Sequence, residues 1–369
     1  MKVLFSVNIP SPYRTEFFNE LGKLCDLTVC YERRSASDRD AKWVGKEAQH
    51  YHEVYLDLKP VGADKSHGSA LRKYIASHKF DRIILTNHFS PACIEAITYC
   101  KLKKIPYLIE FDGGFNNKDS LPKKVIKKYL IGGAAGHLTT CEEHMTYLSE
   151  LGIPRKKIFK YPFSSIMDED VLQKPKTQGE KRSLREKLQM SEEKVIVSVG
   201  RYNLMNGEGK GFDLLFRMAE SMNKNIGIYI IGDEPTERFV QWKNEKALNN
   251  IHFVPFKIKK ELFDYYQAAD LMILLTRGDV WGLVVNEAMA CGLPIITTDR
   301  CMAGLEMVRE GINGYIVPVN TYEEVVDRVS FIFDNEQIYT SMVDESILTA
   351  KQYTIQRMAQ KHIEILKQN

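Results

Sequence analysis

Short apolar runs alternate with longer amphipathic segments along most of the chain. This alternation is typical of α/β units arranged around parallel sheets. In the first half, the apolar runs predict strands at residues 3–7, 27–31, 82–86, 107–110 and 137–140. The segments between them predict helices at residues 15–23, 70–77, 91–102 and 142–151. The first half therefore has the pattern of one α/β domain.

The alternation breaks between residues 164 and 194, where the chain is polar and charged. We interpret this stretch as a linker followed by a short helix at 184–188; the alternative is a surface loop inside one domain. A second α/β series follows it. Its predicted strands are 195–199, 226–231, 252–254, 271–275, 294–297 and 315–317, and its predicted helices are 212–222, 236–247, 260–268, 283–290 and 323–333. The sequence thus predicts domains at 1–163 and 164–350, then a segment 351–369 with a last helix at 356–367.

Composition narrows the class of protein. A length of 369 residues favours two domains over one core. The net charge of +3 is too small to indicate a nucleic-acid partner. Seven cysteines without a CxxC pair argue against a disulfide framework or a structural zinc site, and fit a reducing cytoplasm. No apolar run approaches the roughly 18 residues of a membrane span, so any membrane contact is expected to be peripheral.

The stretch GDVWGLVVNEAMACGLPII carries the clearest candidate chemistry. It follows a predicted buried strand, and ligands in open α/β sheets bind beyond the carboxyl ends of strands. Gly278 and Gly282 permit close backbone approach, and the amide groups at Gly282 and Leu283 open the helix and are expected to face a phosphate. Val284 follows them in the predicted binding set. Asp279 and Glu287 are spaced to flank one sugar nucleotide, because carboxylates accept hydrogen bonds from diols. The alternative is a helix-capping Asp279 and a solvated Glu287.

These residues resemble the signature of the retaining GT-B glycosyltransferases of family 4. The family pattern has an acid, seven residues, a glutamate and then an EAMA-x-G-x-P run, which Asp279, Glu287 and the following AMACGLP match. The usual first acid is glutamate, and here it is the shorter Asp279. The resemblance implies that Glu287 holds the ribose of a nucleotide sugar and that Asp279 positions the sugar.

Two further segments resemble the family's donor-binding elements in the expected order. VSVGR ends a strand and KGFDLL opens a helix, and there the resemblance assigns Arg201 and Lys210 to the donor diphosphate. The loop between them is longer than usual, and a surface pair is the alternative. Gly232 lies in a glycine turn after the next strand, with an ordinary turn as the alternative. Phe256 and Lys257 fall where the family holds the nucleobase.

The first half is less distinctive. Arg14 follows the first strand and opens a helix, where it either contacts a phosphate or acceptor or caps the fold. Asp112 falls where many relatives carry a histidine that contacts the transferred sugar; an acid in a glycine-rich turn is the alternative. His88 also follows a strand, but a lone histidine is more often structural.

Residues 121–131 form a basic amphipathic helix candidate. Lys123, Lys124, Lys127 and Lys128 occupy neighbouring faces, with Val125, Ile126, Tyr129 and Leu130 on the opposite side. Such a helix binds an anionic membrane surface with roughly 1 kcal/mol per lysine, and a solvated helix face is the alternative. The family resemblance favours the membrane, because many relatives act on lipid-linked acceptors.

Taken together, the resemblance implies a GT-B fold, which is two Rossmann-like domains facing a central cleft, with the C-terminal helix crossing back to the N-domain. It implies sugar transfer from a nucleoside-diphosphate sugar to a hydroxyl of a glycan or lipid-linked acceptor, in capsular, exopolysaccharide or lipopolysaccharide biosynthesis. No metal or other cofactor is expected, and the expected location is cytoplasmic or peripheral on the inner membrane face. A sugar-nucleotide epimerase, a phosphorylase and a non-catalytic scaffold for a partner glycosyltransferase stay open as alternatives.

Overall fold

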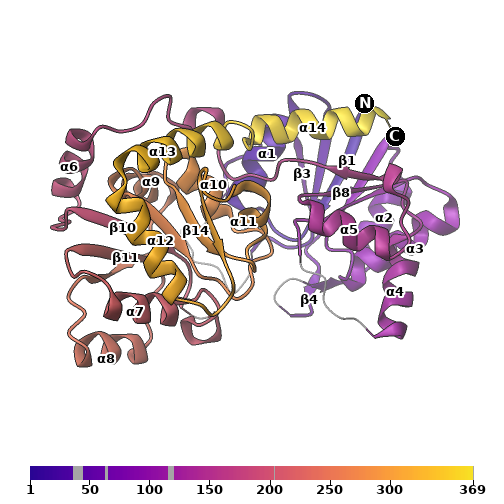
Figure 1. The fold of residues 1–369 in the computed structure, drawn as a ribbon. Coiled ribbons are helices and arrows are strands. Elements are labelled where there is room, and N and C mark those ends of the chain that lie inside the picture. The colour runs from indigo at the N-terminus through magenta and orange to yellow at the C-terminus, as the bar shows by residue number, and fades with distance from the viewer. Residues whose placement is uncertain (36–44, 63–64, 115–119, 203, 369) are drawn as a thin grey trace. The chain divides into compact units, whose positions relative to one another are not determined.

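The computed structural model describes residues 1–35, 45–62, 65–114, 120–202 and 204–368. The chain divides into two compact units, of which the first joins Met1–Ser165 to Thr354–Asn369 and the second is Ile166–Tyr353 (Figure 1). The boundaries thus lie between Ser165 and Ile166 and between Tyr353 and Thr354. The final segment of the chain belongs to the first unit.

The first unit is built on a seven-stranded parallel sheet. Its strands, in spatial order, are β3 (His52–Tyr55), β2 (Asp26–Tyr31), β1 (Lys2–Val7), β6 (Arg82–Leu85), β7 (Leu108–Glu110), β8 (Gly136–Thr139) and β9 (Ile158–Lys160). The central strand β1 pairs with β2 on one side and β6 on the other, so that Val3 faces both Leu27 and Arg82. A short antiparallel pair, β4 (Lys59–Pro60) and β5 (Ser66–His67), stands apart from this sheet.

Helices flank the sheet of the first unit. They are α1 (Pro12–Gly22), α2 (Ala70–Ser77), α3 (Pro91–Lys103), α4 (Leu121–Ile131), α5 (Glu142–Glu150) and the C-terminal α14 (Ile355–Gln368). Proline at the start of α1, α3 and α4 favours initiation there, because its fixed φ suits the first helical turn. Helix α14 packs along α1 (Figure 1), and its buried Ile363 and Leu366 help to close that side of the unit.

The second unit has a six-stranded parallel sheet. Its strands, in spatial order, are β12 (Ile251–Pro255), β11 (Ile226–Gly232), β10 (Lys194–Val199), β13 (Leu271–Leu274), β14 (Ile295–Thr298) and β15 (Gly314–Val317). The central strands β10 and β13 are mostly buried runs rich in Val, Ile and Leu, as expected for a parallel sheet covered on both faces. Ile196, Ile230 and Ile273 from three neighbouring strands lie in one core.

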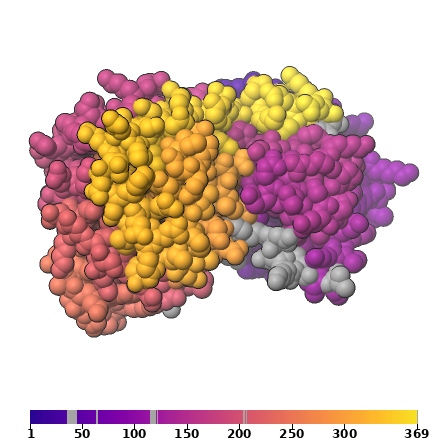
Figure 2. Space-filling model, viewed as in Figure 1, coloured from indigo at the N-terminus to yellow at the C-terminus, as the bar shows by residue number. Residues whose placement is uncertain are grey.

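The helices of the second unit are α6 (Gln178–Lys187), α7 (Phe212–Ser221), α8 (Glu237–Glu245), α9 (Lys259–Ala268), α10 (Leu283–Ala290), α11 (Met302–Met307), α12 (Glu323–Asp334) and α13 (Glu336–Ala350). The side chains of α12 and α13 form a continuous surface on one side of this unit (orange and yellow in Figure 2). The strand order, with β10 and β13 at its centre, is what positions the candidate site.

One predicted element requires correction, and several observed elements were not predicted. The helix predicted at 184–188 begins earlier, at Gln178, because Thr177 and Glu180 form a capping box that starts α6. The stretch 336–350, which the hydrophobic pattern did not predict as an element, is the helix α13. Strands β3 and β9 and helix α11 were also not predicted. The remaining predicted strands and helices are present, with ends shifted by at most three residues.

Within the described residues, no helix is long and apolar enough to cross a lipid bilayer. All seven cysteines are free thiols, and six of them are buried. Burial raises the pKa of Cys30 to about 12, which keeps that thiol protonated and unreactive.

Candidate active site

In the sheet of the second unit, the order in which strands are added reverses between β10 and β13. From β10 the chain proceeds to β11 and β12 on one side, and it then returns to β13, β14 and β15 on the other. Ligands of open α/β sheets bind at such a switch point, beyond the carboxyl ends of the two adjacent strands. Here Gly200 and Arg201 follow β10, and the loop with Asp279 follows β13. The topology therefore brings together two motifs that the sequence places far apart.

Glycines allow the chain to approach itself closely at this point. A Cβ on Gly232 would lie 1.8 Å from the carbonyl oxygen of Gly200, so no larger residue fits there. A Cβ on Gly200 would lie 2.8 Å from Cγ of Lys210, which means that the lysine side chain passes over Gly200. The predicted residues Gly232 and Lys210 thus both contact the end of β10, and half-buried Arg201 is the next residue along the chain.

Lys210 and Asp279 form an ion pair between Nζ and Oδ2. Both side chains are mostly buried, with exposed fractions of 16% and 18%. The amide of Asp279 donates to the Arg300 carbonyl oxygen at 2.8 Å, and Asp279 forms a parallel bridge with Cys301. The carboxylate is therefore held on a fixed main chain, and the ion pair connects the two loops that follow β10 and β13.

Helix α10 begins immediately beyond this pair. Gly282 is its N-cap at φ +100°, where a Cβ would lie 2.7 Å from Sγ of Cys301. Leu283 and Val284 form the first turn, whose amides have no acceptor within the helix itself. The helix start lies beside the Asp279 carboxylate, whose nearest oxygen would be 3.8 Å from that Cβ. This arrangement supplies a second set of donors for an anion next to Lys210.

Glu287 lies on the second turn of α10 and is half-buried. Its Oε2 accepts a hydrogen bond of 3.1 Å from the hydroxyl of Tyr266, a fully buried residue of α9. Burial, and then the neighbouring Glu287 carboxylate, raise the pKa of Tyr266 well above its usual range, so this hydroxyl stays a donor. Tyr266 orients Glu287, and the sequence motif gave no sign of it because the two residues are on different helices.

Phe256 and Lys257 follow the edge strand β12, and both are half-buried. In the sheet order, β11 separates this strand from β10. The structure therefore places them at the same edge of the sheet as Gly232, but farther from the switch point than Lys210 and Asp279.

In the first unit, the structure brings Arg14 and Asp112 together in an ion pair. Nη1 of Arg14 also lies 2.6 Å from Oε1 of Glu110, which is completely buried at the end of β7. Burial would raise the pKa of Glu110, but Arg14 and His362 outweigh it and hold the pKa at about 2. Arg14 is 3% exposed, so its side chain stabilises this end of the sheet and holds the half-exposed Asp112.

His362 of α14 completes the cluster of buried charges. Its Nε2 lies 2.8 Å from Oε2 of Glu110, and its Nδ1 lies 2.7 Å from the carbonyl oxygen of Met358. Each ring nitrogen thus faces an oxygen acceptor, one from a side chain and one from the main chain. Neither Glu110 nor His362 was predicted from the sequence, since they are 252 positions apart along the chain.

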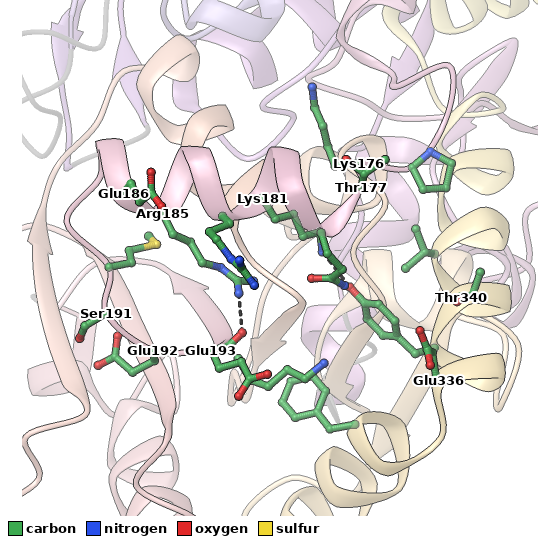
Figure 3. Close-up of a pocket in the computed structure, with 18 of the residues that line it drawn as sticks. Lys176, Thr177, Lys181, Arg185, Glu186, Ser191, Glu192, Glu193, Glu336 and Thr340 are labelled. Atoms are coloured by element: carbon green, nitrogen blue, oxygen red, sulfur yellow. Dashed lines mark hydrogen bonds between the residues drawn. The ribbon is translucent and has the colours of Figure 1, made fainter.

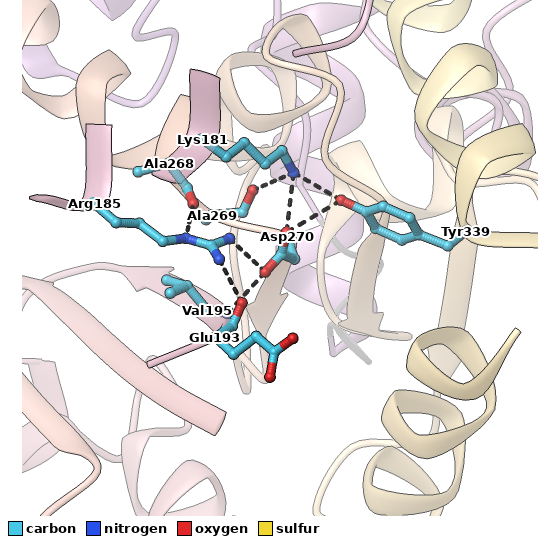
Figure 4. A network of polar contacts seen from close by, with 8 residues as sticks. All are labelled: Lys181, Arg185, Glu193, Val195, Ala268, Ala269, Asp270 and Tyr339. Carbon is cyan, nitrogen blue, oxygen red and sulfur yellow. Dashed lines mark hydrogen bonds and ion pairs between the residues drawn. The ribbon is translucent and has the colours of Figure 1, made fainter. Parts of the chain in front are cut away.

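A separate cavity of about 980 Å³ opens at the other end of the second sheet, near the start of β10 (Figure 3). Lys176, Arg182, Lys194 and Glu336 contribute to its lining. None of the predicted site residues lines it. Beside it, the buried Asp270 accepts hydrogen bonds from Lys181 at 3.1 Å and Arg185 at 2.6 Å (Figure 4). The two buried basic residues of α6 are thus paired within the fold, which indicates a structural role for them.

Helix α4 has an unexpected orientation. Lys123, Lys124 and Lys128 are exposed as predicted, whereas Lys127 is partly buried and donates to the hydroxyl of Tyr147 at 3.0 Å. Three of the four apolar residues predicted on the opposite side are largely exposed, and of these Tyr129 has its ring against Lys101. Val125, Ile126 and Tyr129 are exposed by 67%, 60% and 63%, and burial falls to Leu130 and Ile131 instead.

The described residues include no group of three or more His, Cys, Asp or Glu side chains arranged to hold a metal ion. The Lys210–Asp279 pair and the start of α10 instead combine a cation, an acceptor and helix amides. This set of groups suits a phosphate-bearing ligand with hydroxyl groups nearby.

Comparison with known proteins agrees with this geometry. Residues 180–348 match the family model described as "Glycosyl transferases group 1". An uncharacterized glycosyltransferase of Haemophilus influenzae is 30% identical over 185 residues, which are 48% of this chain and 50% of that protein. The lipopolysaccharide glucosyltransferase WaaG of Escherichia coli is 25% identical over 111 residues, or 30% of this chain and 29% of WaaG. The chain thus spans half or less of the length of these relatives.

Among solved structures, Anabaena HepE in complex with UDP is similar over 100% of both chains, with a TM-score of 0.80 and 15% identity. The WaaG structure is similar over 100% of both chains, with a TM-score of 0.65 and 12% identity. At such identities the similarity concerns the fold, and it confirms the GT-B fold expected from the sequence.

Proposed function

We propose that this chain, whose residues 180–348 match the family model of the glycosyl transferases group 1, moves a sugar from a nucleoside-diphosphate sugar to an acceptor hydroxyl with retention of anomeric configuration. One observation carries the proposal. Lys210 crosses the end of β10 beside Arg201 and pairs with Asp279 at the end of β13. A cation and an acid thus meet at the switch point, where the cation can bind the donor diphosphate and the acid can accept from a sugar hydroxyl.

The chemistry of the transfer assigns a role to each group. As the glycosidic bond to the donor breaks, negative charge develops on the leaving diphosphate. Arg201 and Lys210 stabilise this charge, and each charge-assisted contact contributes roughly 1.5–3 kcal/mol. The amides at Leu283 and Val284 are further donors for the diphosphate. The departing phosphate accepts the proton of the attacking hydroxyl, so the proposal requires no separate basic side chain and no cofactor.

The remaining groups position the donor. Glu287, oriented by Tyr266, accepts hydrogen bonds from the ribose hydroxyls. Asp279 accepts from a hydroxyl of the transferred sugar, whereas the contact predicted for Asp112 with that sugar stays a prediction. Phe256 and Lys257 keep their predicted place near the nucleobase. UDP is the first nucleoside diphosphate to test, since the similar HepE structure was solved with UDP.

The acceptor class is inferred from the relatives. One is named a lipopolysaccharide glucosyltransferase, and another is a Klebsiella pneumoniae protein of a cps region, 27% identical over 194 residues. These names favour a glycan or lipid-linked acceptor in surface polysaccharide assembly.

The orientation of α4 supports a peripheral membrane location for this reaction, on the inner face of the cell membrane. Val125 and Ile126 are largely exposed, and so is Tyr129, although its ring lies against Lys101; Lys124 and Lys128 are their exposed neighbours on the helix. An interfacial helix needs an outward apolar stripe to enter the acyl boundary and basic residues to meet anionic headgroups. Solvated surface helices have the opposite arrangement.

Sedimentation with vesicles tests this location. Wild-type protein is expected to bind phosphatidylcholine vesicles that contain phosphatidylglycerol, and to bind pure phosphatidylcholine vesicles less. Ile126→Glu with Tyr129→Glu is expected to abolish the binding, whereas Leu348→Glu, which changes an exposed leucine on α13, is expected to leave it intact. Equal binding by all three proteins would contradict the membrane location.

A thermal-shift screen with UDP, GDP, dTDP and ADP tests the donor class. Binding to the native state raises the unfolding temperature by mass action, so at least one diphosphate is expected to stabilise the protein. Arg201→Ala should lose that shift. If none of the four nucleotides shifts the wild-type protein, the proposed function is wrong and the non-catalytic scaffold becomes the better account.

A further inference from the structure

Arg277 lies two residues before Asp279, and its side chain contacts the loop that carries Lys210. Nη1 and Nη2 lie 2.7 Å and 2.8 Å from the two carboxylate oxygens of Asp213, which forms a bidentate pair in the first turn of α7. Nε donates to Oδ1 of Asn320 at 2.8 Å, and Nη1 also donates to the carbonyl oxygen of Glu208. Most of the donors of this guanidinium are therefore used inside the protein.

The main chain around Arg277 contacts the same loop. The Arg277 amide and the Thr276 hydroxyl both donate to the carbonyl oxygen of Gly209, each at 3.0 Å. Gly211 has φ +72°, and a Cβ there would lie 2.0 Å from the carbonyl oxygen of Leu275. Contacts thus fix the loop on both sides of Lys210, at Glu208 and Gly209 before it and at Gly211 and Asp213 after it.

This arrangement bears on how Lys210 reaches the donor. The loop between Arg201 and Lys210 is long, and a long loop alone would leave a lysine without a defined direction. Arg277 and Asp279 belong to one short segment, so the residue that fixes the loop and the residue that pairs with Nζ move together. A planar bidentate pair fixes geometry more strictly than a single contact with a lysine.

We propose that Arg277 is a positioning residue for Lys210: it fixes the loop 207–211 on the end of β13 and so directs the lysine toward the donor diphosphate. The inference rests on the proposed function. A direct contact between Arg277 and the diphosphate is the competing account, and the occupied guanidinium argues against it. The two accounts differ in one respect, because only a positioning role depends on Lys210 being present.

A double-mutant cycle with UDP as the probe separates them. Calorimetric UDP affinities are measured for wild type, Arg277→Gln, Lys210→Ala and the double variant. Each single variant is expected to weaken UDP binding about tenfold or more, as for a lost contact with a charged group. The double variant is expected to match Lys210→Ala within about twofold, because Arg277 has nothing left to position.

Two further variants control for folding. Asp213→Asn breaks the same bidentate pair from the other side and is expected to reproduce Arg277→Gln. Arg309→Gln removes an arginine that pairs with Glu345 on α13 and is expected to leave UDP binding unchanged. Unfolding temperatures of all variants show whether the site or the whole unit has changed.

The possible failures are distinguishable. If the losses of the two single variants multiply in the double variant, Arg277 acts independently of Lys210 and the inference is overturned. Unchanged UDP binding in Arg277→Gln overturns it as well. If the wild-type protein binds neither UDP nor GDP, dTDP or ADP, the proposed function fails and the inference fails with it.

Discussion

The Tyr266 hydroxyl donates a hydrogen bond of 3.1 Å to Glu287, and it does so from a different helix and with a fully buried ring. The family motif names the glutamate, but it does not show this contact, which helps to fix where its carboxylate points. A carboxylate that must hold a ribose diol benefits from a fixed orientation, since an oriented group loses less entropy when the ligand binds.

Removing the Tyr266 hydroxyl should therefore weaken the binding of the donor without unfolding the protein. Tyr266→Phe is expected to raise the donor KM and the Kd of the nucleoside diphosphate by about three- to tenfold, as for one lost hydrogen bond to a charged group. Tyr265→Phe, on the same helix, is the matched control and should behave as wild type. Equal values for both variants would show that Tyr266 does not orient Glu287.

The Lys210–Asp279 pair predicts that one substitution affects UDP affinity and the rate of transfer in opposite directions. Asp279→Asn releases Lys210 from its partner, so UDP should bind at least as tightly as in wild type. Transfer should slow by about tenfold or more, because a charged acceptor for the sugar hydroxyl is lost. Steady-state kinetics and calorimetry check the two parts separately. A variant that loses UDP affinity while keeping kcat would reverse the roles given to this residue.

The link between α14 and the first sheet predicts a large effect on stability. His362→Ala removes one of the partners of the buried Glu110, and it is expected to lower the free energy of unfolding by about 2–4 kcal/mol in urea. Glu364→Gln, which removes a surface pair with Lys361 on the same helix, should cost less than about 1 kcal/mol. Similar costs for the two variants would mean that the buried cluster does not hold α14.

Glu32 gives the protein a pH-dependent term in its stability. It is buried immediately after the end of β2, where its Oε2 accepts hydrogen bonds from Ser90 Oγ at 3.2 Å and Asn87 Nδ2 at 3.3 Å. Burial, against these hydrogen bonds, raises its pKa from 4.5 to about 6. The folded-state pKa lies above the unfolded one, so this contribution to stability is present below pH 4.5 and is lost as the pH rises through 6.

The variant Glu32→Gln should lack this term. Its free energy of unfolding relative to wild type is expected to rise by about 2 kcal/mol between pH 4 and pH 8, which corresponds to roughly 1.5 pKa units at 1.36 kcal/mol each. Urea unfolding at a series of pH values gives the difference directly. A difference that stays constant across this range would show that Glu32 ionises in the folded protein as it does in the unfolded chain.

Elements with a clear hydrophobic period were predictable from the sequence. Helix α10 has the predicted bounds because a buried strand precedes it and Gly282 marks its start. Helix α6 was misjudged because its basic residues suggest a solvated surface, whereas Lys181 and Arg185 are buried on Asp270. Its capping box was a signal that could have been used. Helix α13 buries Met342, Val343, Ser346, Ile347 and Ala350, which lie on one face at helical spacing, so this period was a signal that the prediction did not use.

The candidate site shows a similar division. Local motifs indicated the glycines, the acids and the basic residues of the second unit. Their neighbours Tyr266 and Arg277 were not predicted, because each contacts a residue of another helix. His362 of the first unit was not predicted for the same reason, since it contacts Glu110 at the end of β7. A single sequence contains no local signal for such pairs. The parallel sheet order, which follows from the topology, was needed to bring β10 beside β13.

The central claim is that Arg201 and Glu287 belong to one donor site that carries out sugar transfer. The most direct measurement is turnover of a nucleoside-diphosphate sugar, starting with UDP-glucose, by the wild-type protein and by Arg201→Ala and Glu287→Ala. Both variants are expected to lose about tenfold or more in kcat/KM while unfolding at the wild-type temperature. Wild-type turnover by both variants would contradict the account.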